Sequence, residues 1–385
     1  MTHGGPATLP SRETQEQPQR PARWPALDGL RAIAILAVIG LHVGILPGGY
    51  LGVDVFFVLS GFLITSLLIS EWDERGGSIS FRRFYARRVL RILPALGCVL
   101  AVAALVAAII LAVRWKRDTG YADATLSGVP WALLFAGNVD QVLHPGGLPL
   151  GALGPTWSLA VEEQFYLLWP ALFVLLMRRR LSRSGLALAF GCLAVAEMIY
   201  RLVAASHGWS HDRLYFGTDT HSDGLLLGCA LAFWLSARQP GKPAPSRLAA
   251  GLTWGAATVI AVVFLAGAKA WEAGAVSAAV LGTAVVLAAL VSGRAPAALD
   301  RALRARWAVW IGRRSYGLYL WHGLILAFTE ALISPYTGIF PAGGWRRVVW
   351  SVALVGAVAV SFIVTDLSYR RVELPALRLK RRFRG

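Results

Sequence analysis

Histidine, arginine and carboxylate side chains occur inside long apolar segments of this 385-residue sequence. Arg31 and His42 lie eleven residues apart in one such segment, and Asp54 lies near the start of the next. In a helix, eleven residues make about three turns, so Arg31 and His42 share one face and lie about 16 Å apart. An imidazole titrates near neutrality and a carboxylate can fix its tautomer, which is the pairing that general acid–base catalysis needs.

Later apolar segments carry further polar groups at helical spacing. These groups are Glu162 with Tyr166, Asp219 with Asp223, and the stripe Ser315, Tyr319 and His322, while His221 falls on a different face. We expect them at one depth around a single cavity, in which Asp54 or Glu162 orients His42. The alternative for each group is a structural hydrogen bond between helices, because polar side chains also join helices in lipid.

The overall composition indicates what kind of protein contains these apolar segments. The sequence is 56% hydrophobic and 15% charged with a mean hydropathy of +0.57, whereas a soluble domain is about 45–50% apolar and about 25% charged. A soluble enzyme and a largely disordered chain are therefore disfavoured. Since a bilayer core requires about 20 apolar residues per helix, we predict an all-α polytopic membrane protein. Its ten predicted spans are 26–46, 50–70, 89–113, 156–177, 185–204, 219–236, 249–267, 272–292, 308–329 and 347–367.

Segment 128–143 is short and carries Asn138 and Asp140, so we predict a re-entrant or interfacial segment. Ten spans place most arginines on one side, which the positive-inside rule makes the cytoplasm. This distribution explains the net charge of +17 without nucleic acid. We therefore expect both termini in the cytoplasm, with 1–25 a disordered tail, 376–385 a basic tail, and no signal peptide.

Two other features bear on chemistry. Cys98, Cys192 and Cys229 lie inside apolar runs and offer neither a disulfide framework nor metal-ligand spacing, so we expect no metal.

Arg88 and Arg91 are one turn apart at the start of the third span, and arginine forks suit phosphate groups. The alternative for these arginines is plain topology or contact with lipid headgroups.

Several short motifs occur in a fixed order between residues 26 and 375. They are Leu27-Asp28-Gly29-Leu30-Arg31-Ala32, the Arg-x10-His of Arg31 and His42, Gly52 to Phe62, the Arg-x-x-Arg of Arg88 and Arg91, Thr156 to Tyr166, Ser315 to His322, and Glu373-Leu374-Pro375. Each motif is weak alone, but the order is specific. With these motifs the sequence resembles the acyltransferase family 3 integral-membrane O-acyltransferases.

The resemblance implies a bundle of about ten helices in a bacterial plasma membrane, with residues 26–375 as the acyltransferase domain. It also implies transfer of an acyl group, commonly acetyl, from cytosolic acyl-CoA to a hydroxyl of a sugar, glycan or natural product, with no permanently bound cofactor. By this resemblance His42 is catalytic, and Arg31, Arg88 and Arg91 bind the donor. We place Asp54 and Glu162 with His42, and expect Tyr166, Asp223, Tyr319 and His322 to contact substrate.

Two departures from the family pattern concern the end of the chain and one side chain. The sequence ends at 385, so we expect no soluble hydrolase-like domain, and His221 stands where many relatives carry Arg. The competing function is a transporter or flippase, although the expected inverted repeats are not evident. Direct transfer and an acyl-His42 relay both remain open, as do the acceptor, the acyl group and the oligomeric state.

Overall fold

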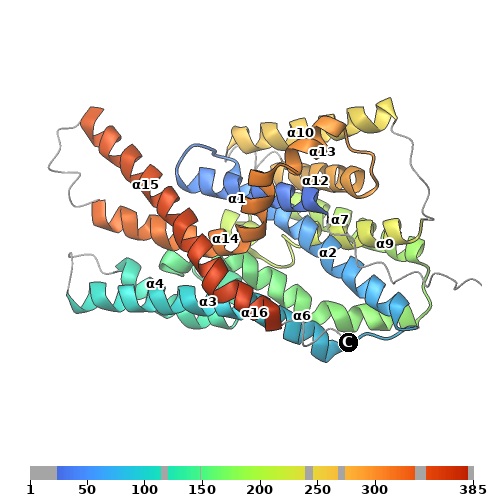
Figure 1. The fold of residues 1–385 in the computed structure, drawn as a ribbon, viewed down its shortest axis with the longest axis horizontal. Helices are drawn as coiled ribbons and strands as arrows, with labels where there is room; N and C mark the ends of the chain where they lie inside the picture. Colours follow the sequence, from blue (N-terminus) through green and yellow to red (C-terminus); the bar gives the residue numbers. More distant parts are fainter. Residues whose placement is uncertain are drawn as a thin grey trace, which may run out of the picture.

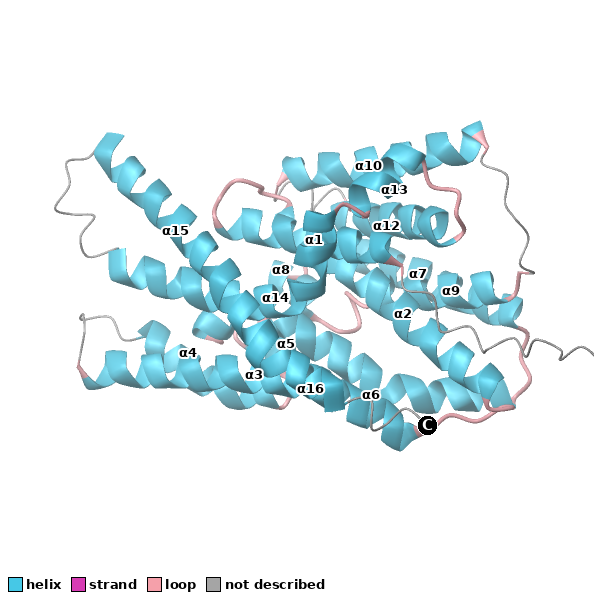
Figure 2. Cartoon of the chain, viewed as in Figure 1, coloured by secondary structure: helices cyan, strands magenta, loops and turns pink. Residues whose placement is uncertain are grey.

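The computed structural model describes residues 24–113, 120–147, 149–238, 246–267, 274–333 and 344–379. These residues form helices and no strand (Figures 1 and 2). In chain order the elements are α1 (Pro25–His42), η1 (Gly49–Leu51), α2 (Gly52–Glu74), α3 (Phe81–Ala112), α4 (Gly120–Leu133), α5 (Gly137–Leu143), η2 (Gly151–Leu153), α6 (Thr156–Arg178), α7 (Arg183–Ser206), α8 (His211–Phe216), α9 (Asp223–Ser236), α10 (Arg247–Ala266), α12 (Ala275–Val291), α13 (Ala297–Leu303), α14 (Arg306–Ile333), α15 (Gly344–Ser368), the π-helix η4 (Tyr369–Glu373) and α16 (Leu374–Leu379).

Eight helices in the described ranges are long and apolar enough to cross a bilayer, and α9 and α12 are shorter apolar helices. Each of the ten predicted spans coincides with one of these helices. The prediction of an all-α polytopic membrane protein is therefore confirmed. In Figure 1, α15 crosses the front of the bundle diagonally, with α3 and α4 along its lower edge and α10 along its upper edge.

Two helix starts differ from the predicted spans by four residues or more. Helix α3 begins at Phe81, eight residues before the predicted start, because the Ser80 side chain caps it by accepting from the Arg83 backbone N–H. The arginines before residue 89 are therefore helical and project at fixed angles. Helix α9 begins at Asp223 and not at residue 219, so Asp219 and His221 lie in the turn before the apolar helix.

A break interrupts the ambiguous segment 128–143. Helix α4 ends at Leu133 and α5 begins at Gly137, with Phe135 between them at a φ of 52°. The Gln164 side chain on α6 donates a hydrogen bond of 2.9 Å to the Phe135 carbonyl, which holds the turn. A continuous span is therefore absent here, and the re-entrant or interfacial position stays a prediction.

The predicted tails lie mostly outside the described residues, which begin at Trp24 and end at Leu379. Helix α16 (Leu374–Leu379) covers the first positions of the predicted C-terminal tail. Those positions are therefore helical.

Glycines bring the central helices into backbone contact, as small residues do in membrane bundles. A Cβ atom at Gly61 on α2 would lie 2.1 Å from the Leu225 carbonyl oxygen on α9. A Cβ atom at Gly312 on α14 would lie 1.7 Å from the Asp28 carbonyl oxygen on α1. This second contact fixes the register of α1 against α14, the two helices that carry the predicted histidines.

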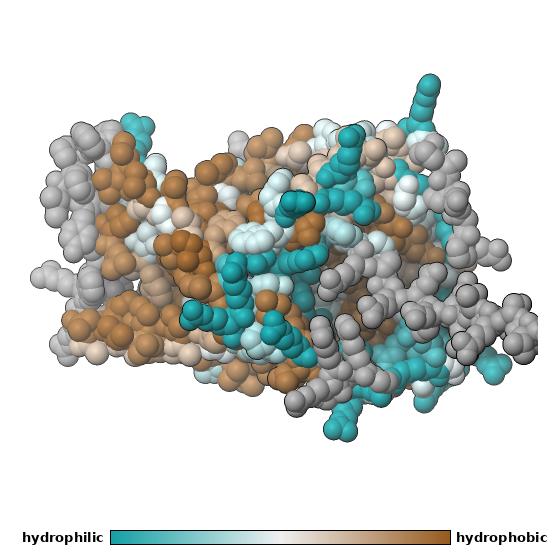
Figure 3. All heavy atoms as spheres, viewed as in Figure 1, coloured by the Kyte–Doolittle hydropathy of each residue, from teal (hydrophilic) through white to brown (hydrophobic). Residues whose placement is uncertain are grey.

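The outer surface divides into an apolar part and a polar part (Figure 3). Hydrophobic residues dominate the left half of this view, where α3 and α14 end and α4 and α15 begin, and hydrophilic residues gather over the centre and right. Large apolar side chains such as Leu105, Leu168 and Val355 are more than 60% exposed. Their exposure is what a lipid-facing surface requires.

Candidate active site

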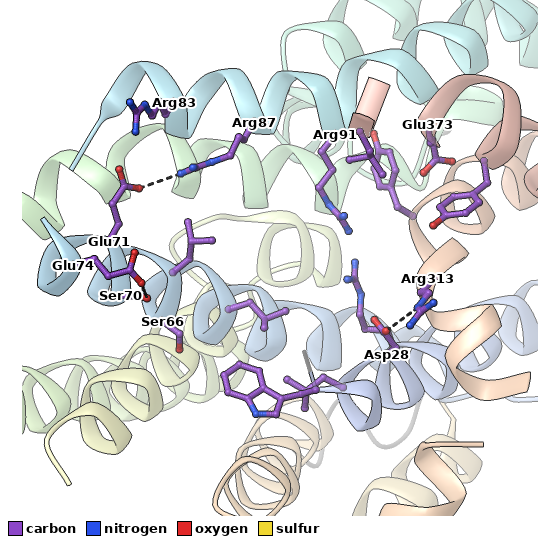
Figure 4. A pocket seen from close by; sticks show the side chains of 18 of the residues that line it. Asp28, Ser66, Ser70, Glu71, Glu74, Arg83, Arg87, Arg91, Arg313 and Glu373 are labelled. Atoms are coloured by element: carbon purple, nitrogen blue, oxygen red, sulfur yellow. Dashed lines mark hydrogen bonds and ion pairs between the residues drawn. The ribbon is translucent and has the colours of Figure 1, made fainter. Parts of the chain in front are cut away.

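A large basic cavity opens at the end of the bundle where α1 and α14 begin. Its volume is about 1020 Å³, and six arginines and four carboxylates are among its lining residues. Figure 4 shows Arg83, Arg87 and Arg91 in one row along α3, with Arg87 reaching toward Glu71 and Arg91 extending into the cavity. Arg87 donates to Glu71 over 3.1 Å. The excess of guanidinium groups makes this cavity suitable for a polyanion.

Three arginines of this cavity, Arg31, Arg83 and Arg91, form no ion pair among the described residues. Arg31 lies on α1, and Arg83 and Arg91 lie on α3. Arg313, by contrast, pairs with Asp28 over 3.4 Å. Arg31 and Arg91 were both predicted to bind the donor, and the structure brings them to one cavity.

Arg88 does not line this cavity, which departs from the expectation that Arg88 and Arg91 bind the donor together. Its guanidinium donates to Glu163 over 2.6 Å and lies 3.4 Å from the centre of the Tyr166 ring. Together these three residues line a separate cavity of about 190 Å³ beside α6. The reason is helical geometry: steps of four residues keep Arg83, Arg87 and Arg91 in a row, whereas Arg88 is rotated by about 100° from Arg87.

A small polar cavity of about 60 Å³ lies next to the basic cavity, and Arg31 and Tyr316 line both. Glu162 lines the small cavity and accepts a hydrogen bond of 2.7 Å from Ser60. Tyr319 lines it as well, and its hydroxyl donates to the Pro155 carbonyl over 2.8 Å. The polar surface therefore continues from the basic cavity into the bundle as far as Tyr319.

Two histidines follow Tyr319. The His322 ring is 5.8 Å from the Tyr319 ring and 4.9 Å from the His42 ring, measured between centroids. His42 ends α1 and is exposed, whereas His322 on α14 is 0% exposed. Nδ1 of His42 lies 2.8 Å from the Val38 carbonyl, and Nδ1 of His322 lies 2.9 Å from the Leu318 carbonyl. A carbonyl can only accept, so both Nδ1 atoms carry the proton and both Nε2 atoms present a lone pair.

Asp54 does not orient His42, which corrects our expectation. Its Oδ1 lies 2.8 Å from Nε2 of His221, whose Nδ1 faces the Tyr215 carbonyl. Glu162 does not orient His42 either, since its partner is Ser60. The physical reason is that the Val38 carbonyl on the same helix already occupies Nδ1 of His42, the nitrogen to which a carboxylate would bind.

His221 lies just before α9 and is held by Asp54 in a buried ion pair. Burial opposes the charged imidazolium, but the Asp54 carboxylate outweighs burial, so the pKa of His221 is raised above its ordinary value of 6.5. Both ring nitrogens face acceptors, which also favours the doubly protonated ring. The pair therefore joins α2 to the turn before α9.

Both carboxylate oxygens of Asp223 are also hydrogen-bonded, and Asp223 lines none of the cavities described above. Arg201 on α7 donates to its two carboxylate oxygens over 3.0 and 2.8 Å, and also to Ser277 on α12. Asp219 pairs instead with Arg213 at an exposed position, and this guanidinium lowers the pKa of Asp219. The expectation of a single cavity at one depth is therefore wrong.

Sequence reasoning overlooked several residues. Arg83, Arg87 and Arg313 line the basic cavity, and the four-residue spacing with Arg91 was the available signal for the first two. Glu373 also lines it and is buried, with Oε1 unpaired among the described residues. Arg201 holds Asp223, and an arginine inside an apolar run was a sufficient signal.

Taken together, these observations define a polytopic membrane protein with a basic cavity at one end, from which polar side chains lead to a histidine pair. A family model for an acyltransferase domain matches residues 24–366, so the chain belongs to that acyltransferase family. The resemblance inferred from the motifs is confirmed. No solved structure matches the chain.

Curated relatives agree with this family. The chain is 34% identical to the peptidoglycan O-acetyltransferase OatA of Listeria monocytogenes, over 91% of this chain and 55% of that protein. It is 34% identical to the putative peptidoglycan O-acetyltransferase YrhL of Bacillus subtilis, over 91% of this chain and 54% of that protein. It is 32% identical to the O-acetyltransferase OatA of Staphylococcus aureus, over 94% of this chain and 58% of that protein. The chain thus spans little more than half the length of these relatives.

Proposed function

We propose that this protein is a membrane O-acyltransferase that moves an acetyl group from acyl-CoA to a hydroxyl group of a glycan. The observation that carries the proposal is the connection of three sites: the basic cavity, the small polar cavity that shares Arg31 and Tyr316 with it, and the pair His42 and His322. The names of the relatives support O-acetyl transfer. They also make peptidoglycan the first acceptor to test.

The basic cavity fits the nucleotide end of acyl-CoA, which is its polyanionic part. Ligand sites commonly occupy about 300–1,000 Å³, and this cavity has about 1020 Å³. Arg83, Arg87 and Arg91 present guanidinium forks along one helix, and such forks bind phosphate oxygens in pairs. Arg31 stands where this cavity meets the small one, so it receives the phosphate nearest the pantetheine arm.

The distance from Arg31 to His42 suits a long, thin donor. Eleven residues along α1 correspond to about 16 Å, which an extended pantetheine arm is able to span. The small polar cavity with Glu162, Ser60 and Tyr319 lies on this route. The thioester would therefore arrive at the histidine pair while the nucleotide stays among the arginines.

His42 acts as the general base for the acceptor hydroxyl. Its Nε2 lone pair is available because Nδ1 donates to the Val38 carbonyl. The ring is exposed at the end of α1 opposite the basic cavity, where a glycan can approach. With the positive-inside rule, the basic end faces the cytoplasm and both chain ends lie there. Donor and acceptor then enter from opposite sides.

The direct test uses purified protein in detergent or a lipid nanodisc with radiolabelled acetyl-CoA and soluble peptidoglycan fragments. We expect release of CoA thiol together with label that alkali removes from the fragments as an ester. A transporter or flippase would leave acetyl-CoA intact under these conditions. An intact thioester after long incubation would therefore overturn the proposal.

A further inference from the structure

The two histidines are not equivalent in position. Gly312 on α14 contacts the backbone of Asp28 on α1, and both helices run from the basic end toward the histidines. Counting along both helices from this contact places His322 level with Val38, one turn nearer the basic cavity than His42. One turn is about 5.4 Å. A donor that enters from the basic cavity therefore meets His322 before it meets His42.

The side chain of His322 is also unusual for a structural residue. It is 0% exposed, and its Nε2 atom has no hydrogen-bond partner among the described residues. A buried polar atom that has a purely structural role is normally bonded. Two polar rings lie close to the His322 ring: His42, whose Nε2 also carries a lone pair, and Tyr319, which lines the small cavity.

Direct transfer from thioester to hydroxyl requires one proton carrier, and His42 suffices for that. Two imidazoles with free Nε2 lone pairs, one nearer the donor and one exposed, match the needs of a double displacement, in which one group is the nucleophile and the other the base. Resting on the acyl transfer proposed above, we propose that His322 is a catalytic nucleophile that carries the acyl group between acyl-CoA and the acceptor.

In the first step, the Nε2 lone pair of His322 attacks the thioester carbonyl carbon. The C–S bond breaks and CoA leaves as the thiolate toward the arginines of the basic cavity. An N-acylimidazolium remains, whose Nδ1 keeps its proton and donates it in a hydrogen bond to the Leu318 carbonyl. This carbonyl is an acceptor suited to the positive charge that the ring gains.

In the second step, the acceptor hydroxyl transfers its proton to Nε2 of His42 while its oxygen attacks the acyl carbon. The C–N bond breaks, and its electron pair returns to Nε2 of His322. The proton on His42 then goes to water, and the CoA thiolate takes one from water. The sum is acyl-CoA plus alcohol giving ester plus CoA thiol, so atoms and charge balance.

Isotope exchange in the unmodified protein tests this route without any substitution. A double displacement predicts that the protein, given acetyl-CoA and radiolabelled CoA but no acceptor, moves label into acetyl-CoA. Direct transfer predicts no such exchange. Wild-type protein that acetylates peptidoglycan fragments without exchange would overturn this inference and leave the proposed function standing, whereas no reaction in either assay would overturn the proposed function itself.

Two substitutions then assign the roles. His42→Gln should keep exchange and lose transfer to the fragments, and it should accumulate acetyl on the peptide that contains His322, detected by mass spectrometry. His322→Gln should lose both reactions. His207→Gln is the matched control, because Nδ1 of His207 also lies 2.8 Å from the carbonyl four residues earlier but the ring is exposed outside the site.

The opposite pattern, with exchange kept by His322→Gln and lost by His42→Gln, would make His42 the acyl carrier and overturn the inference. Acetyl found on any peptide other than that of His322 would also overturn it. Melting temperatures of all three variants are measured in the same detergent. The exchange result for wild-type protein decides the route even where a variant melts early.

Discussion

Replacing Arg91 with Gln should weaken acyl-CoA binding far more than replacing Arg88, although the two residues lie one turn apart. Arg91 extends into the basic cavity, and no ion pair in the described parts of the chain neutralises it (Figure 4). Hydrogen bonds to charged groups contribute about 1.5–3 kcal/mol. Each 1.4 kcal/mol changes a binding constant about tenfold, so Arg91→Gln should raise the KM for acetyl-CoA by about 10- to 140-fold.

Arg88→Gln should instead reduce stability. Arg88 and Glu163 form a mostly buried pair, with side chains 17% and 13% exposed. Removing one partner of a buried ion pair costs about 3–5 kcal/mol, because the other charge stays buried and unpaired. Adding Glu163→Gln to Arg88→Gln should recover much of the loss in melting temperature, while the KM for acetyl-CoA should change little in either variant.

The assay follows CoA thiol release against acetyl-CoA concentration, with melting temperature measured on the same preparation. Arg82→Gln is the control, since Arg82 is exposed on the same helix and does not line the cavity. Arg91→Lys should restore part of the affinity, and high salt should narrow the difference from wild type. A KM raised equally by Arg88→Gln, with normal melting, would refute the assignment of these two arginines.

Three further results are expected. His42→Ala should lower the rate of acyl transfer by about 10²–10⁴-fold at unchanged melting temperature, and near-normal turnover would remove His42 from the mechanism. Because the pKa of His221 is raised, its ion pair with Asp54 stabilises the fold fully below about pH 6.5, and this stabilisation is lost as pH rises through the folded-state pKa of His221. The melting temperature should therefore fall more steeply between about pH 6 and 9 in wild type than in His221→Gln. Equal dependence of melting temperature on pH in the two proteins would contradict this. Arg201→Met should cost about 3–5 kcal/mol by leaving Asp223 buried and unpaired, measured as early melting that Asp223→Asn in the same chain partly reverses.

The spans could be predicted from the sequence because apolar length is a local property that each helix carries itself. All ten fell on observed helices, and the break near Phe135 agreed with the short apolar run there. The predicted starts of the helices were less accurate. The α3 helix is capped at Ser80, which lies in a polar stretch that a search for apolar segments does not include. The basic cavity was anticipated through Arg31 and Arg91, which the structure brings together.

The partners of the buried carboxylates could not be predicted in the same way. Asp54 was expected with His42 but bonds His221, which is 167 positions away in the chain. Such pairings depend on which helices touch, and α2 packs on α9 through Gly61. The sequence places each group on a helix at a given depth, but it does not determine which neighbour the group faces.

The π-helix η4 (Tyr369–Glu373) has a consequence for insertions and deletions. A π turn amounts to one extra residue accommodated within an α-helix, so removing one residue such as Val372 would restore regular α-helical hydrogen bonding. Each residue turns a regular α-helix by about 100°, but the wide π turn takes up its extra residue, so this deletion would leave Glu373 and α16 close to their present orientation relative to α15. The position of Glu373 in the basic cavity should therefore tolerate the loss of one residue within η4, whereas the loss of one residue within the regular helix α15 would turn Glu373 away from the cavity.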